Sequence, residues 1–252
     1  MIHASSLLVP TLPENADASP RARDGSRDVA AMTGDRSLPE AVSISPNADE
    51  WDDHWQRQRT SAFGSLCSWY RRNIRARSVA YYFERYFPPT GVFAECGSGS
   101  SETSCRIQVR QRKLIAVDFS VEALARAARM PQISECIRAD IRDLPFADNS
   151  LDGIWNLGVM EHYEKDEQLL ILREFHRVLK PGGKMLLWWP PRLALDHSLL
   201  SWVGRQFPAE PGRCDRQYVI EALQSAGFSD GRVRFPLSDC FTEYQIVAFR
   251  VE

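Results

Sequence analysis

The fold of this chain is decided by the stretch Val92-Phe93-Ala94-Glu95-Cys96-Gly97-Ser98-Gly99-Ser100-Ser101. An apolar run ends there in the carboxylate of Glu95, and the two glycines Gly97 and Gly99 follow. The polar segment behind them predicts a helix over residues 101–111. A strand, a glycine turn and a helix start in this order are typical of loops that present backbone N–H groups to a nucleotide-like ligand.

Two further carboxylates end apolar runs later in the chain. Asp118 closes the run 114–118, and Asp140 closes the run 137–140. Each carboxylate lies roughly 20 residues after the previous one, about the length of one strand–helix repeat. The spacing therefore predicts three neighbouring strands that each end in an acid.

Strands and helices are expected to alternate along most of the chain. The expected strands are 92–95, 114–118, 135–138, 152–157, 184–189, about 231–235 and 244–250. The expected helices are 51–58, 69–87, 101–111, 120–129, 166–179 and 215–226. A turn at Pro181-Gly182-Gly183 separates the helix 166–179 from the strand after it. The sequence thus predicts an α/β fold: a Rossmann-like, seven-stranded, mostly parallel sheet with helices on both faces and a C-terminal antiparallel hairpin strand.

Composition and charge indicate a single globular domain with an N-terminal extension. The chain has 252 residues, 44% of them hydrophobic, and a formal charge of −2. This balance gives no basic face for nucleic acid, and no apolar run approaches the ~20 residues of a membrane span. Residues 1–48 lack periodicity and predict a disordered extension. Residues 49–252 are expected to form the domain, with cap helices at 49–90.

The six cysteines stand at irregular spacings. They form no C-x-x-C motif and no His/Cys cluster, so neither a metal site nor a disulfide framework is expected. Cys96 and Cys136 are interpreted as small buried groups in a reducing compartment, which favours a cytoplasmic location. The sequence carries no signal for an oligomeric state.

Four blocks of sequence resemble a known enzyme family, in order and at the family's spacing. They are Glu95–Ser101, Ala116–Ser120, Ala139–Phe146 and Leu151–His162. The chain resembles the class I S-adenosylmethionine-dependent methyltransferases, in the UbiE-like small-molecule branch with the type 11 methyltransferase domain, from about Trp51 to Glu252. The family often has a third glycine where this chain has Ser101, and serine is expected to serve as a helix N-cap there.

The resemblance implies a site for S-adenosylmethionine as methyl donor, at the carboxyl ends of the strands. The glycine loop would lie beside the methionine part, Glu95 would orient that loop, and Asp118 would accept hydrogen bonds from ribose hydroxyls. The residues that the resemblance assigns to cofactor binding are Glu95, Gly97, Ser98, Gly99, Asp118, Phe119, Asp140, Ile141, Asn156 and Leu157. Among them, Phe119 and Ile141 would pack on the adenine, Asp140 would accept from its exocyclic amine, and Asn156 and Leu157 would face the sulfonium.

Each acid and aromatic in this set also has an ordinary structural explanation. Glu95 fits a solvated strand terminus, Asp118 fits the N-cap of the following helix, and Asp140 fits a turn residue. Phe119 equally fits a buried structural aromatic.

His162 is the candidate general base for methyl transfer, because histidine titrates near neutral pH and this one follows the fourth strand. Alternatively, Glu161-His162 only shapes the loop before the next helix. The acceptor is expected to be a small apolar or aromatic molecule. Its pocket would draw on Tyr70, Tyr81 and Tyr82 of the 69–87 helix, Trp188 to Pro191, and a lid insertion at 192–214. Core packing explains the same aromatics.

Three other functions are possible for a sequence of this pattern. A nicotinamide dehydrogenase would need glycine where the chain has Glu102, which argues against G-x-G-x-x-G. A protein or RNA methyltransferase is disfavoured by the neutral charge and by Asn156-Leu157-Gly158-Val159 at the position of an Asn-Pro-Pro-Tyr-type tetrad. A non-catalytic binding protein on the same fold stays open, although the intact glycines and acids favour an enzyme.

Overall fold

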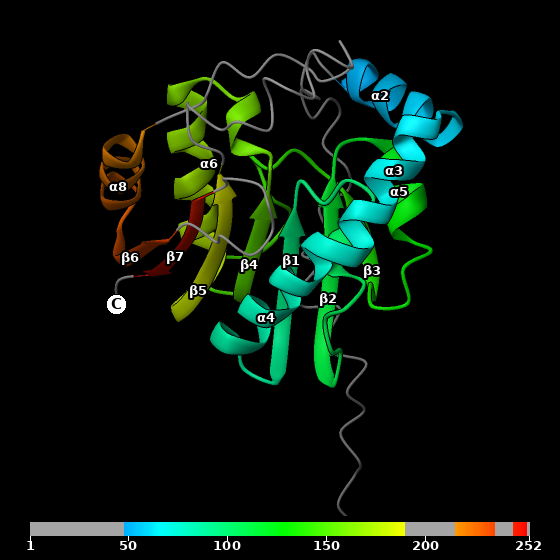
Figure 1. Ribbon diagram of the computed structural model, residues 1–252. Helices are drawn as coiled ribbons and strands as arrows, with labels where there is room; N and C mark the ends of the chain where they lie inside the picture. Colours follow the sequence, from blue (N-terminus) through cyan, green and yellow to red (C-terminus); the bar gives the residue numbers. More distant parts are fainter. Residues whose placement is uncertain (1–47, 190–214, 235–243, 251–252) are drawn as a thin grey trace, which may run out of the picture.

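The computed structural model describes residues 48–189, 215–234 and 244–250. The extension expected at 1–48, apart from Ala48, and the lid expected at 192–214 lie outside the described residues. Within them, the strands form one sheet in the order β3-β2-β1-β4-β5-β7-β6, with helices on both faces (Figure 1). The α/β class predicted from the sequence is confirmed.

The described elements have the following bounds. The strands are β1 Thr90–Cys96, β2 Gln111–Asp118, β3 Glu135–Arg138, β4 Leu151–Leu157, β5 Leu179–Trp189, β6 Phe228–Arg234 and β7 Tyr244–Arg250. The α-helices are α2 Ala48–Thr60, α3 Ala62–Tyr70, α4 Ala76–Tyr86, α5 Val121–Ala127, α6 Lys165–Val178 and α8 Arg216–Ser225. A π-helical turn η1 covers Arg71–Arg75, and 3₁₀ turns cover Glu102–Ser104 (η2) and Met160–His162 (η3).

The parallel part of the sheet reverses its strand order next to β1. Strand β1 pairs in parallel with β2 on one side and with β4 on the other. Strand β5 continues in parallel beyond β4. Beyond it, β7 pairs antiparallel with β5, and the edge strand β6 pairs antiparallel with β7. Open α/β sheets bind ligands outside the carboxyl ends of their strands at such a reversal. The fold therefore predicts a ligand site at the carboxyl ends of β1 and β4.

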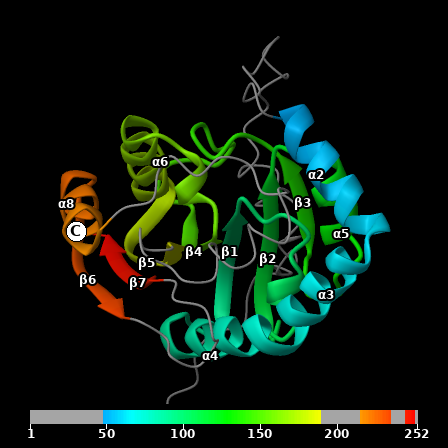
Figure 2. The same ribbon diagram turned by 45° about the horizontal axis from the view of Figure 1, so that its top comes forward.

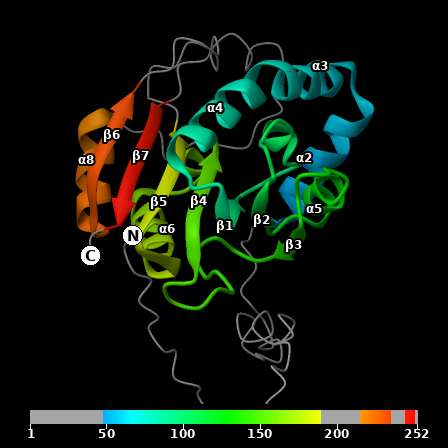
Figure 3. The ribbon, with the colours of Figure 1, turned by 90° about the horizontal axis from the view of Figure 1, so that it is seen from below.

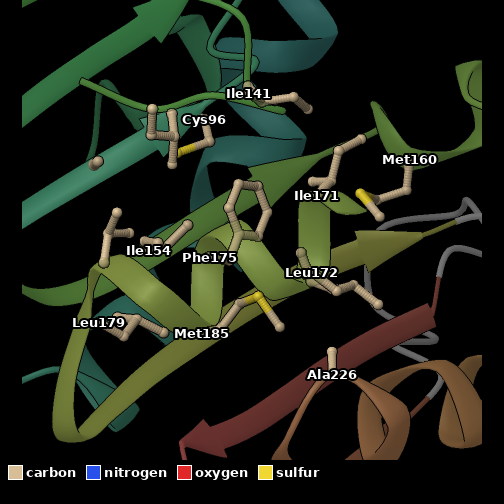
Figure 4. Close-up of a cluster of buried hydrophobic side chains, with 14 of the residues drawn as sticks. Cys96, Ile141, Ile154, Met160, Ile171, Leu172, Phe175, Leu179, Met185 and Ala226 are labelled. Carbon is tan, nitrogen blue, oxygen red and sulfur yellow. The ribbon is translucent and has the colours of Figure 1, made fainter. Parts of the chain in front are cut away.

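Neighbouring residues of the strands bury opposite faces of the sheet. Trp155 of β4 packs with Phe83 of α4 and Phe93 of β1 on one face. Ile154 belongs to the cluster on the other face, which includes Phe175 of α6 (Figure 4). Because a strand points successive side chains to opposite sides, these fully buried residues hold both helical layers to one sheet. Each large apolar side chain contributes roughly 1.5–3 kcal/mol of burial free energy.

One long outer helix crosses the face of the sheet that carries α4. Helices α3 and α4 are joined without a break by the π-helical turn η1 (Figure 3). The helix ends at Phe87, whose ψ of 142° is extended, since the proline that follows disfavours helical backbone there. The outer helix spans the range predicted at 69–87 and begins earlier, at Ala62.

The helix predicted at 101–111 is wrong. Only the 3₁₀ turn η2 forms there, and Ser101 adopts a left-handed φ of 50° without capping it. The buried Glu102 is drawn toward the outer helix by Ser68 and Arg72. These contacts hold the segment in a conformation that a regular α-helix would not allow. Ser101 is therefore not the expected N-cap.

Two smaller expectations also need correction. Strand β5 begins at Leu179 rather than 184, and the predicted turn at 181–183 bulges out of it where the register with β4 shifts. Gly182 has a φ of +70° in that bulge. Cys136 is half-buried rather than buried, because β3 lies at the edge of the sheet.

Among the described residues, no helix combines the length and apolar character needed to span a membrane.

Candidate active site

The carboxylate of Asp118 ties the glycine loop to the end of β2. Its Oδ2 accepts a hydrogen bond from the N–H of Gly99 at 2.8 Å, and its Oδ1 accepts one from the N–H of Ser120 at 2.9 Å. The N–H groups of Gly97 and Ser98 donate to the carbonyl of Val117 at 2.8 and 3.0 Å. The loop is thus fixed against the last two residues of β2. Ser120 caps α5 through its own hydroxyl, so Asp118 is not the N-cap.

Both glycines of the loop lie where a side chain has no room. A Cβ on Gly97 would stand 2.7 Å from Val159, and Gly97 has a φ of +69°. A Cβ on Gly99 would stand 2.5 Å from the ring of Trp55, and Gly99 has a φ of +50°. Because left-handed backbone also disfavours any side chain, only glycine fits either position. The loop is held between the end of β4 and helix α2.

Glu95 ends β1 as a buried carboxylate with hydroxyl partners. Its Oε2 accepts from the hydroxyl of Ser104 at 3.0 Å, and that hydroxyl accepts from the indole N–H of Trp155 at 3.2 Å. Thr103 donates to Oε1 at 3.4 Å. The side chain is 2% exposed, which excludes the interpretation of Glu95 as a solvated strand terminus. Glu95 therefore joins the strand end to η2 and β4.

Burial raises the pKa values of both loop carboxylates. Burial raises the pKa of Glu95 to about 7, although hydrogen bonds from neighbouring side chains partly oppose it. Burial likewise raises the pKa of Asp118 to about 6, against the backbone hydrogen bonds from Ser120 and Gly99. Two acids that titrate near neutral pH beside one loop are typical of a functional site.

Asp140 is held by an arginine that the sequence analysis did not single out. The guanidinium of Arg142 donates to Oδ2 at 2.6 Å, and the backbone N–H of Arg142 donates to Oδ1 at 2.9 Å. The hydrogen bond to Asp140 raises the pKa of Arg142. The guanidinium also donates to Glu167 of α6 at 2.6 Å and lies over the ring of Tyr163. The backbone bond fits the turn interpretation of Asp140. A contact with adenine stays a prediction.

Family comparison places a methyltransferase domain on this sheet. A model described as "Methyltransferase domain" matches residues 94–187, the segment from β1 to β5 that carries the glycine loop and the three acids. A probable S-adenosylmethionine-dependent methyltransferase of Mycobacterium tuberculosis is 26% identical over 229 residues, covering 88% of this chain and 71% of the relative. This chain is an S-adenosylmethionine-dependent methyltransferase. S-adenosylmethionine is its methyl donor.

Other matches are partial in length or in identity. The chloroplastic 2-methyl-6-phytyl-1,4-hydroquinone methyltransferase of Arabidopsis thaliana is 30% identical over 146 residues, covering 56% of this chain and 40% of that protein. The crystal structure of human N-acetylserotonin methyltransferase with S-adenosylmethionine matches with a TM-score of 0.61 at 18% identity, covering 82% of this chain and 58% of that one. Magnesium protoporphyrin IX methyltransferase from Synechocystis, with S-adenosylhomocysteine bound, matches with a TM-score of 0.60 at 16% identity, covering 81% and 96%. At such identities the structural matches show the shared fold.

In this methyltransferase, the end of β4 lies directly against the end of β1. The side-chain amide of Asn156 donates to the carbonyl of Cys96 at 2.6 Å, and its Oδ1 is buried without a hydrogen-bond partner. Leu157 is half-buried beside it, and Gly158 follows with a φ of 62°. The predicted pair Asn156 and Leu157 therefore borders the glycine loop.

The predicted adenine neighbours occupy different environments. Ile141 is 1% exposed and belongs to the core cluster beneath α6, whereas Phe119 is half-buried after β2. The carbonyl of Phe119 accepts from Arg138 of β3 at 3.0 Å. Phe119 follows the end of β2, and Ile141 follows the end of β3.

His162 ends the 3₁₀ turn that follows β4. Its ring stands against Trp51 of α2, with ring centroids 4.8 Å apart, and its Nε2 lies 4.0 Å from the carboxylate of Glu161. The histidine is thus packed between the end of β4 and the cap helix α2. Both the base role and a loop-shaping role are compatible with this position.

Helix α2 supplies contacts that the sequence analysis missed. Asp52 accepts hydrogen bonds from the hydroxyl of Ser120 and the N–H of Glu122 at the start of α5. Trp55 covers Gly99, and the guanidiniums of Arg71 and Arg126 lie 5.2 and 5.3 Å from its ring. Figure 2 shows α2 beside α5 and β3. The aromatic residues spaced four apart in this polar helix, Trp51 and Trp55, were the available signal.

The aromatics expected around the acceptor divide into two groups. Tyr82 packs edge-on to Trp188 with centroids 6.4 Å apart, beside the end of β5. Tyr81 is 63% exposed and points away from the sheet. Between these tyrosines and α3, Arg71 and Arg72 pair with Glu102, and Arg75 is buried. No group of residues in the described part of the chain is arranged to hold a metal ion.

Proposed function

We propose that this enzyme methylates a small apolar or aromatic molecule by in-line transfer from S-adenosylmethionine. The observation that carries the proposal is the position of Asp118. Its carboxylate holds the glycine loop through two backbone hydrogen bonds, at the point where the strand order of the sheet reverses. A carboxylate has about four acceptor positions, so it keeps capacity for two ribose hydroxyls. The donor set thus fits an adenosyl group.

The cofactor would be held by residues from four strand ends. The loop of Gly97, Ser98 and Gly99 would take the methionine part, with Glu95 behind it. Asp118 and Phe119 would take the ribose and one adenine face, Asp140 and Ile141 the far edge of the adenine. Asn156 and Leu157 would border the sulfonium, and the free Oδ1 of Asn156 supports a polar neighbour there.

When bound, S-adenosylmethionine supplies a methyl carbon that is already activated by its sulfonium leaving group, and transfer releases S-adenosylhomocysteine. The protein then has to align the acceptor and exclude water. A base is required only where the nucleophile carries a proton. His162 would accept that proton, with its ring oriented by Trp51.

The acceptor class is inferred from the side chains beside the end of β5. There the half-buried Tyr82 and Leu157 belong, with the buried Trp188, to one apolar and mainly aromatic cluster. The Arabidopsis relative is named for a phytylated hydroquinone, which is both aromatic and apolar. The described cysteines Cys67, Cys96, Cys105 and Cys136 are free, which supports work in a reducing, cytoplasmic compartment.

The proposal is tested in two stages with the full chain. Calorimetry with S-adenosylmethionine should give saturable heat, and Asp118→Asn should weaken binding at least about tenfold. Incubation with methyl-labelled cofactor and host extract should then yield a labelled small molecule, identified by mass. Label found only in the protein or RNA fraction would contradict the small-molecule acceptor while leaving the cofactor site intact.

A further inference from the structure

The outer helix carries large apolar side chains on its solvent side. Leu66 is 59% exposed, Trp69 is 55% exposed and Tyr81 is 63% exposed. The same helix buries Val79 and Phe83 completely against the sheet. The helix is therefore apolar on both sides, and only one side has a partner among the described residues.

The exposed residues follow one another along a single face. We call this face the outer stripe, and its members are Ala62, Leu66, Trp69, Arg77, Tyr81 and Arg85. All are exposed. Their separations of three, four or eight positions repeat the period of a helix, and the wide turn η1 falls in the one long interval. Figure 3 shows α3 and α4 as an arch on the outside of the molecule.

The charge of this helix is opposite to that of the whole chain. Residues 62–86 contain five arginines and only one acid, Glu84, whereas the chain has a formal charge of −2. Arg71 and Arg72 are engaged by Glu102. Arg77 and Arg85 have no ion-pair partner in the described part of the chain, and both lie in the outer stripe. The exposed face is thus apolar, aromatic and cationic.

Arg85 extends this positive charge to the C-terminal end of α4. It borders an open hollow of about 450 Å³ that is also lined by Lys180 and Lys184. Lys180 is paired with Asp152 at 2.8 Å, so the net charge at the hollow remains positive. An anionic surface laid along the stripe would meet cations at this end as well.

We propose that the outer stripe docks the enzyme on an anionic lipid bilayer, with the helix in the plane of the interface. Leucine, tryptophan and tyrosine side chains enter the boundary between headgroups and acyl chains, and arginines beside them attract anionic lipids. Self-association is the poorer occupant, because a two-fold contact through the stripe would bring its arginines toward like charges. The inference goes beyond the proposed methyl transfer and does not depend on the acceptor.

The test is co-sedimentation of the full chain with two kinds of vesicle, pure phosphatidylcholine and an equimolar mixture with phosphatidylglycerol. The protein should bind the mixed vesicles and lose binding as salt is raised. The double variant Leu66→Ser with Trp69→Ser should bind at least about tenfold more weakly. Arg77→Glu should weaken binding only to the anionic vesicles.

The matched control is Leu170→Ser on α6, where an equally exposed leucine (53%) lies outside the stripe. This variant should bind as the wild type does. Thermal melts and cofactor binding should be unchanged in every variant, since all these positions are exposed. Wild-type protein that ignores both vesicles overturns the proposal, as does undiminished binding by the Leu66 and Trp69 double variant. Concentration-dependent dimers that the double variant abolishes, without vesicle binding, also overturn it.

Discussion

The ring of Trp51 stands at 82° to the imidazole of His162, with 4.8 Å between their centroids. Trp51 belongs to α2 and His162 follows β4, so the N-terminal cap orients the proposed base. The same tryptophan also packs edge-on to His54, one turn later in α2. If His162 is the base, the cap helix is part of the active site through this contact.

Replacing Trp51 by alanine should lower kcat about fivefold and leave cofactor affinity nearly unchanged. Loss of one edge-to-face ring contact costs about 1 kcal/mol, and the contact holds the base rather than the cofactor. Steady-state kinetics with separate kcat and KM values check this, and Trp51→Phe should retain activity. Equal loss in both variants would point away from the ring contact.

Replacing His162 by alanine should lower kcat about a hundredfold if the acceptor carries a proton. Steady-state turnover of the variant and of the wild type, measured with the same acceptor, checks this. Full turnover in the His162→Ala enzyme would remove the base role and leave His162 as a loop-shaping residue.

Gly99→Ala should lower the melting temperature and weaken cofactor binding at least about tenfold. The new Cβ would stand 2.5 Å from Trp55 on a backbone with φ +50°, so strain and clash add. Gly182→Ala is the matched control, because Gly182 has a φ of +70° with no atom within 4 Å of its Cβ position. That variant isolates the backbone strain of roughly 1–2 kcal/mol. Equal effects of the two substitutions would rule out a role for Trp55.

Cofactor affinity should rise with pH until both loop carboxylates are ionised. Burial holds the pKa of Asp118 at about 6 and that of Glu95 at about 7. Below those values the acids are protonated and lose capacity to accept hydrogen bonds, so affinity should fall by up to about tenfold per pH unit. Calorimetry across this range checks the slope, and Glu95→Gln should flatten its upper part.

The same raised pKa predicts the stability of the cofactor-free protein. The folded pKa of Glu95, about 7, lies above its unfolded value of about 4.3, so its contribution is present at low pH and is lost as pH rises between these values. The stability of Glu95→Gln relative to the wild type should thus rise with pH, by on the order of 3–4 kcal/mol above pH 7. Urea unfolding at several pH values measures the difference. A constant difference at all pH values would contradict the shift.

Glu102→Gln should destabilise the fold by about 1–3 kcal/mol. Its carboxylate is 3% exposed, accepts from Ser68 at 2.5 Å, and lies within 4 Å of Arg71 and Arg72. Burial raises the pKa of Glu102, but the Ser68 bond and the arginines outweigh it and hold that pKa below its usual value. Removing the charge leaves buried guanidinium without its partner.

The control for Glu102 is Glu135→Gln, because Glu135 forms a more exposed ion pair with Lys113 at 2.7 Å. That substitution should change stability by less than about 1 kcal/mol. Both free energies come from urea unfolding. Since the pKa of Glu102 is depressed, its contribution should be present at neutral pH and fade as pH falls below the unfolded value of about 4.3.

Much of the fold was predictable because it depends on local patterns. Strand β2 was expected at 114–118 and found at Gln111–Asp118, since an apolar run between polar turns leaves few alternatives. The helix expected at 101–111 failed because a long-range partner, the outer helix, holds Glu102. The local sequence shows polar, helix-compatible residues, but it contains no information about this distant partner.

The positions of the three candidate acids were predictable from the sequence, whereas the residues that surround them were less so. Glu95 and Asp118 lie in the last two residues of β1 and β2, and Asp140 lies two residues after β3, so chain spacing alone located them. Arg142 was missed because nothing in its local sequence distinguishes an arginine that holds a site from one on a surface. Trp55 was missed although its spacing of four from Trp51 in a polar helix was a signal. Their roles follow from the packing of α6 and α2.

Local sequence is sufficient for the alternation of strands and helices, the glycine loop and the order of the acids, because these features depend on periodicity and on backbone freedom over a few residues. Packing of distant segments places Trp55 over Gly99 and Trp51 against His162, and it leaves the outer stripe without a cover among the described residues. Those contacts join residues tens of positions apart, and their geometry exists only once the helices have packed against the sheet.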